Sequence, residues 1–158
     1  MAEPQKQRLT RHFLRSEVVR PDIDWTDLPP GVTPAEAERH LTALLAAVVE
    51  PWRAVVGRIR VTDGLRPLRR HVALGGRLDD PGQHSFGDAL DGYPLDLLVL
   101  DAWAVLVRLA RSGLPVDQAI LEYGSGESPS HIHVSHSLDR DPRCDLLIER
   151  GGNYTRAR

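Results

Sequence analysis

The sequence has few of the features that mark disulfide-bonded, membrane-spanning or nucleic-acid-binding proteins. Its 158 residues include one cysteine, so an internal disulfide is excluded and any metal must use histidine and carboxylate ligands. No apolar run reaches the roughly 20 residues of a transmembrane helix, and the first residues lack the apolar stretch of a secretory signal. The 20 basic and 22 acidic residues nearly cancel, which argues against a nucleic-acid partner. We therefore expect a protein made in the cytoplasm, without a membrane span.

The length fits a single domain over residues 1–158. Residues 9–18 predict one short amphipathic helix, and the prolines that follow predict a loop, so residues 1–32 are expected to form a wrapping N-terminal arm. Thr33 and Glu36 then form a capping box, with Pro34 at the first helical position. Apolar residues at three- and four-residue steps predict a helix from there to about Val56.

The rest of the chain mixes strand and helix patterns. Alternating residues predict a strand over 58–62, a second helix is expected over about 96–112, and strands over 118–123 and 131–136 are joined by a polar hairpin loop. This order predicts an α+β domain with a small, mainly antiparallel sheet flanked by helices. Residues 146–148 fit either a final strand or a surface that contacts a partner.

Three residues stand out as candidate metal ligands. His84 and Asp91 lie in a segment rich in glycine and proline, where a loop and a short strand can bring them together. His131 and His133 alternate on a predicted strand and therefore share a face. Two histidines and one carboxylate form a catalytic zinc set that leaves one position for water. The alternative is that these are ordinary surface or hydrogen-bonded groups.

The run from His84 to Asp91, H-S-F-G-D-A-L-D, matches the pattern HxxGxAxD. In this it resembles the M15-type peptidases, which include D-Ala-D-Ala carboxypeptidases and phage endolysins that cut L-alanyl-D-glutamate. Further similar motifs occur in the family's order at residues 9–17, 61–66, 75–76 and 132–135. The resemblance implies a hedgehog/DD-peptidase-like fold and a Zn²⁺ ion held by His84, Asp91 and His133.

The chain also departs from the family's pattern. Gly82 and Asp63 stand where serine is usual, His71 stands where an asparagine is common, and Ser130 stands where some branches carry glutamate. These positions concern substrate contact and proton transfer rather than metal binding. Zinc binding is therefore the safer prediction from the sequence, and catalytic turnover is the less secure one.

Two residues are candidates for moving protons. His131 ranks first because it shares a strand face with His133. Glu122 ranks second, because a symmetric hairpin centred near Glu127 would place it opposite Ile132, on the wrong face, unless a bulge or shifted register moved it.

Two further residues are expected to orient the substrate. Arg66 would hold a carboxylate or stabilise the transition state, because a guanidinium can donate two parallel hydrogen bonds. Gln83, next to His84, is the second.

Together these patterns predict zinc-dependent hydrolysis of an amide bond in peptidoglycan stem peptides. The motifs favour a phage or prophage enzyme that acts on the cell wall after release or as part of a virion. A second hypothesis is a catalytically inactive zinc-bearing module that binds the wall or forms part of a phage tail or injection machine, with virion or tail proteins as partners. A third is an interaction domain whose histidines are incidental. Which stem-peptide bond is cut, and the oligomeric state, stay open.

Overall fold

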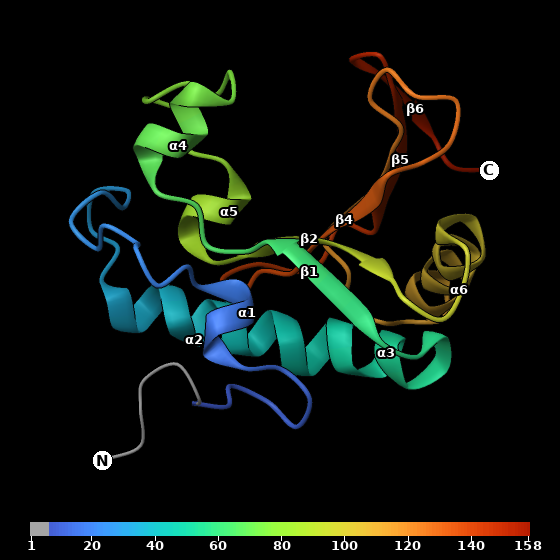
Figure 1. The fold of residues 1–158 in the computed structure, drawn as a ribbon, viewed down its shortest axis with the longest axis horizontal. Helices are drawn as coiled ribbons and strands as arrows, with labels where there is room; N and C mark the ends of the chain where they lie inside the picture. Colours follow the sequence, from blue (N-terminus) through green and yellow to red (C-terminus); the bar gives the residue numbers. More distant parts are fainter. Residues whose placement is uncertain (1–6) are drawn as a thin grey trace.

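The computed structural model describes residues 7–158 and has a mixed α/β fold around one six-stranded sheet (Figure 1). The strand order is β1-β2-β4-β3-β5-β6, and every neighbouring pair is antiparallel except β3 and β5. The mainly antiparallel sheet confirms that part of the prediction, and residues 146–148 belong to a strand. The strands are β1 (Ile59–Asp63), β2 (Ala89–Pro94), β3 (Gln118–Glu122), β4 (His131–Ser135), β5 (Asp145–Arg150) and β6 (Asn153–Arg156).

The predicted helix from Pro34 to Val56 is present as three consecutive segments. These are α2 (Pro34–Leu44), a π-helical turn η2 (Leu45–Val49) and α3 (Glu50–Val56). The wide turn precedes Pro51, which has no N–H to donate and whose ring would clash with a carbonyl in a regular helix. The predicted apolar stripe is fully buried, at Leu41, Leu44, Leu45, Val48, Val49 and Trp52.

The second long helix, α6 (Val99–Arg111), begins three residues later than expected. Asp96 does not cap it, because its carboxylate accepts hydrogen bonds from the backbone N–H and guanidinium of Arg58 at the start of β1. The indole N–H of Trp52 donates to the carbonyl of Ala102 over 3.0 Å and so joins α3 to α6.

The two faces of the sheet differ in character. Alternate residues of the central strands, among them Leu90, Leu121, Ile132 and Val134, belong to the main apolar core. In Figure 1 the rod of α2 and α3 runs below the sheet, whereas α4 (Leu68–Ala73) and α5 (Gln83–Phe86) stand above β1 and β2. The remaining alternate residues, including Asp91 and His133, point to the face opposite the core.

The prediction of a helix over residues 9–18 is wrong for the first half of that range. Only the single turn α1 (Arg15–Val18) is helical, because the carbonyl of Phe13 accepts the backbone N–H of Leu9 and closes a turn before it. Phe13 and Val18 are buried in the main core, so the arm packs against the rest of the protein. Residues 1–6 of that arm lie outside the described residues.

Among residues 7–158, no helix has both the length and the apolar character needed to cross a bilayer.

Candidate metal centre

His84, Asp91 and His133 converge on one point at the open face of the sheet. Asp91 on β2 lies directly opposite His133 on β4, and His84 reaches them from α5. Asp91 Oδ1 is 3.0 Å from His133 Nδ1 and 3.2 Å from His84 Nε2, and the two nitrogens are 3.2 Å apart. The three residues predicted as ligands therefore form a compact triangle of donor atoms.

Gly87 explains how His84 and Asp91 come together across so few residues. It ends α5 with a φ of +83°, a left-handed conformation that glycine adopts without strain. A Cβ atom at this position would lie 2.3 Å from the backbone oxygen of Ala37 in α2. Glycine thus allows α5 to sit against α2 while the chain turns directly into β2.

Hydrogen-bond partners assign the proton on each imidazole. His84 Nδ1 lies 2.8 Å from the carbonyl oxygen of Gly64, which can only accept, so this nitrogen carries the proton. His133 Nε2 lies 3.1 Å from Gln83 Oε1, and the amide of Gln83 is oriented by its Nε2, which donates to Asp117. The nitrogens that face Asp91 therefore present lone pairs.

Three electron-pair donors at 3.0–3.2 Å repel one another unless a cation lies among them. A tetrahedral ion with bonds of about 2.0–2.1 Å separates its ligand atoms by about 3.3 Å. The distances in the triangle are close to that spacing. Each side chain also makes a hydrogen bond through an atom outside the triangle, as metal ligands usually do. These residues could hold a metal ion.

Burial and charge favour the protonation states that a metal requires. Burial lowers the pKa of His133, which keeps its imidazole neutral. Burial alone would raise the pKa of Asp91, but its interactions with His133 and His84 hold that pKa well below its ordinary value. Neutral imidazoles and an ionised carboxylate are the ligand forms of these side chains.

Arg66 contacts the outer oxygen of the same carboxylate. Its Nη2 lies 3.4 Å from Asp91 Oδ2, while the guanidinium makes bonds of 2.7 and 2.9 Å to Asp63. Asp63, which stands where the resembled family has serine, therefore fixes Arg66 beside the candidate ligand. Arg66 lines the cleft, as its predicted substrate-orienting role requires.

Glu122 lies on the same face as His133, so the prediction that it would face away is wrong. The hairpin pairs Glu122 with His131 and Ile120 with His133, one residue away from the symmetric register. Burial, followed by the nearby charges of Asp91 and Glu149, raises the pKa of Glu122 to about 7. In the metal-free protein, Glu122 therefore exchanges its proton near neutral pH.

His131, the first candidate for proton transfer, lies on the same sheet face but is not among the residues that line the cleft. Its Nδ1 is 2.8 Å from the hydroxyl of Ser130. The geometry thus favours Glu122 over His131 for proton transfer.

An open cleft of about 620 Å³ surrounds the triangle. Gln83 lines it, but its amide oxygen is bound to His133 and its amide nitrogen to Asp117. Gln83 is therefore placed to orient the candidate metal ligand His133 rather than a substrate. Arg140 and Arg143 also line the cleft. Sequence reasoning missed both arginines, because they lie in a loop that matches no motif.

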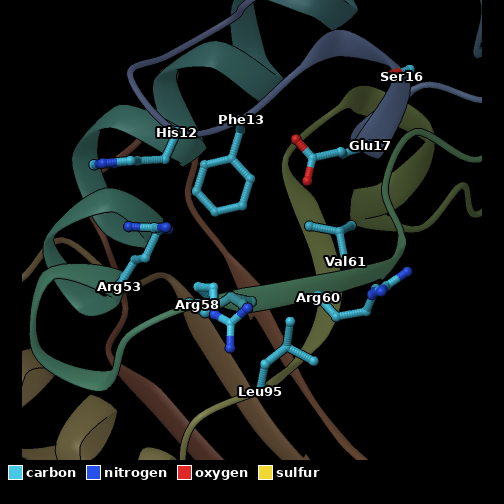
Figure 2. Close-up of a pocket in the computed structure, with 10 residues that line it drawn as sticks. His12, Phe13, Ser16, Glu17, Arg53, Arg58, Arg60, Val61 and Leu95 are labelled. Carbon is cyan, nitrogen blue, oxygen red and sulfur yellow. The ribbon is translucent and has the colours of Figure 1, made fainter.

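A second groove lies between the N-terminal arm, α3 and the edge strand β1 (Figure 2). Three of the titratable groups that line it are held by structural contacts: His12 binds Glu50, Glu17 binds the backbone N–H of Leu14, and Arg58 binds Asp96. The groove therefore lacks the convergent donors found in the first cleft.

No model of a known protein family matches the sequence, and a search of curated proteins finds no match.

Proposed function

We propose that the protein is a zinc-dependent peptidase that hydrolyses an amide bond in peptidoglycan stem peptides and has a hedgehog/DD-peptidase-like fold. The observation that carries this proposal is the convergence of three lone-pair donors in an open cleft that is also lined by the carboxyl group of Glu122. The first group suits a metal, and the second suits general acid–base catalysis at neutral pH.

The donor set favours zinc over the other common ions. Magnesium and calcium prefer sites made of oxygen ligands, whereas two imidazoles and one carboxylate suit zinc. Three protein ligands are typical of catalytic sites, since structural zinc sites usually use four. Zinc held by His84, Asp91 and His133 would supply Lewis acidity for the attacking water and the amide carbonyl.

Glu122 is the proposed general base. Its carboxylate would take a proton from the attacking water and later pass it to the departing amine. In the metal-free protein burial raises the pKa of Glu122 to about 7, and a zinc ion bound nearby would lower that pKa and favour the ionised base.

Arg66 is proposed to orient the substrate while it holds Asp91. Its guanidinium is bound to Asp63 on one side and lines the cleft on the other. A cation fixed in this way stabilises negative charge that develops on an amide oxygen without first having to reorganise.

The substrate class is proposed from the resemblance to M15-type peptidases, whose HxxGxAxD pattern includes two of the three clustered residues. Either a D-Ala-D-Ala carboxypeptidase or an endopeptidase of the endolysin type is consistent with the open, polar cleft. A phage or prophage origin, with action at the cell wall after release or within a virion, belongs to the same proposal.

The test combines metal content with turnover. We expect one zinc per chain in the native protein and in His136→Ala, and none in His133→Ala. His136 is the matched control, because its Nδ1 contacts the carbonyl of Pro115 and it is not part of the triangle. Release of amino groups from purified peptidoglycan should follow the zinc content.

Each other outcome has a definite meaning. Zinc without amine release would favour the inactive wall-binding or tail-component hypothesis. No zinc in the native protein would overturn the proposal.

A further inference from the structure

One end of the cleft carries two arginines held by a single buried carboxylate. Arg140 and Arg143 come from the loop 136–144 between β4 and β5. Arg140 Nη2 lies 2.5 Å from Asp117 Oδ2, and Arg143 makes contacts of 2.8 and 3.0 Å to the two oxygens of Asp117. Arg140 and Arg143 together form the arginine pair.

The arginine pair carries more charge than Asp117 neutralises. The side chain of Asp117 has no exposed surface, whereas those of Arg140 and Arg143 are 43% and 49% exposed. Two guanidiniums against one carboxylate leave one net positive charge (2 − 1 = +1), and both guanidiniums line the cleft. Positive charge therefore faces the cleft here, beside the carboxylate of Asp80, which also lines it.

The two arginines are held to different degrees. Arg143 uses Nε and Nη2 on Asp117, and its backbone N–H also donates to that carboxylate, so it anchors the loop. Between described residues, Arg140 makes one hydrogen bond, through Nη2, and its other N–H groups are open to a ligand. Arg140 is therefore better placed to bind, and Arg143 to support it.

A short relay connects the arginine pair to the candidate metal centre. Gln83 donates to Asp117 over 2.9 Å and accepts from His133 over 3.1 Å. Two hydrogen bonds and the single amide group of Gln83 thus separate Asp117 from His133. An extended peptide covers about 3.3–3.6 Å per residue, so a substrate bound beside His133 would need only a few residues to reach Arg140.

We propose that the arginine pair binds a free carboxylate of the peptide substrate, a few residues from the bond that is cut. Guanidinium groups bind carboxylates through charge-assisted hydrogen bonds, and a pair braced by a buried acid is already ordered before the ligand arrives. This inference rests on the proposed function and adds to it a preference for anionic stem peptides. The carboxylate is either the C-terminal one or that of a D-glutamate within the stem.

The test uses zinc-loaded Glu122→Gln protein, so that the peptides stay intact during calorimetry. Two pairs of synthetic stem pentapeptides are compared, one differing in a C-terminal carboxylate or carboxamide and the other in the D-glutamate carboxylate or its amide. We expect amidation in one of the pairs to weaken binding by about tenfold or more. Adding Arg140→Gln should remove that preference. Arg69→Gln, which removes an 85% exposed arginine outside the cleft, should leave it unchanged.

The outcomes separate this inference from the proposed function. Equal binding of acid and amide in both pairs would overturn the inference and leave the peptidase intact. A carboxylate preference that survives Arg140→Gln would also overturn it, since another group would then be the receptor. Failure of all the peptides to bind would overturn the proposed function itself. If Arg140→Gln does not fold, Arg140→Lys takes its place and should weaken the preference, because lysine cannot donate two parallel hydrogen bonds to one carboxylate. An unchanged preference in Arg140→Lys would overturn the inference.

Discussion

Glu122 of β3 lies directly opposite His131 of β4. Residues paired in this way share a face of the sheet, and that face also carries His133. Glu122 therefore points into the cleft with the candidate metal ligands, and burial beside Asp91 and Glu149 raises its pKa to about 7. The assignment of proton transfer depends on this one pairing.

The first prediction compares the two candidates for proton transfer. Glu122→Gln should lower kcat for amide hydrolysis by about 100-fold or more while zinc content stays at one per chain. His131→Ala should change kcat by less than about threefold, because His131 does not line the cleft. Steady-state kinetics with metal analysis on both variants makes the measurement. A larger loss in His131→Ala than in Glu122→Gln would reverse the assignment.

The second prediction concerns the pH dependence of stability in the metal-free protein. The pKa of Glu122 rises from its ordinary 4.5 to about 7, so the folded chain holds this proton more tightly than the unfolded chain. The resulting stabilisation is fully present below about pH 4.5 and is lost as the pH rises through about 7. Since the side chain is only half-buried, we expect a contribution on the order of 1–2 kcal/mol.

Urea unfolding at several pH values tests this. The stability of Glu122→Gln relative to the native protein should increase between pH 5 and pH 8, because glutamine has no proton to lose. A relative stability that stays constant with pH would show that the pKa of Glu122 is not raised.

The third prediction concerns Gln83, which accepts a hydrogen bond from His133. Gln83→Leu should weaken zinc binding by about 10- to 100-fold, because the hydrogen bond that fixes the tautomer and ring orientation of His133 is lost. Gln118→Leu is the control, since Gln118 also lines the cleft but donates to Asp145 instead. Competition with a zinc chelator measures both affinities. Equal affinities in the two variants would show that Gln83 does not position His133.

The fourth prediction separates backbone conformation from close packing at Gly87. Gly87→Ala should destabilise the protein by about 3 kcal/mol or more, because it adds a contact of 2.3 Å with the Ala37 carbonyl to the cost of a left-handed alanine. Gly31→Ala has the same φ of +83° with open space around the Cβ, and it should cost only about 1 kcal/mol. Thermal unfolding measures both. Similar losses would mean that the α2 contact relaxes.

Much of the local structure could be predicted because short-range patterns determine it. The capping box of Thr33 and Glu36 and the apolar spacing that follows specify a helix on their own, and that helix is present. The residue types at His84, Asp91 and His133 likewise indicate metal chemistry, and the alternation of His131 and His133 places both on one strand face.

Other features arise from residues that are far apart in the sequence. The first half of the helix predicted over 9–18 is a turn, and the helix expected from about residue 96 begins at Val99, while Asp96 binds Arg58. Local propensity is weak compared with tertiary contacts, so such positions follow their distant partners.

The sequence alone therefore determined which donors and acids the protein has and which helices and strands carry them. Only the tertiary structure decided how they meet. A shift of one residue in the β3–β4 register turns Glu122 toward His133, because side chains alternate between the two faces of a sheet. The hydrogen bonds that His84 donates to Gly64 and His133 donates to Gln83 decide which nitrogens face Asp91. The folding of loop 136–144 over Asp117 brings two arginines into the cleft. These hydrogen bonds join residues 20 to 50 positions apart, and no local pattern encodes them.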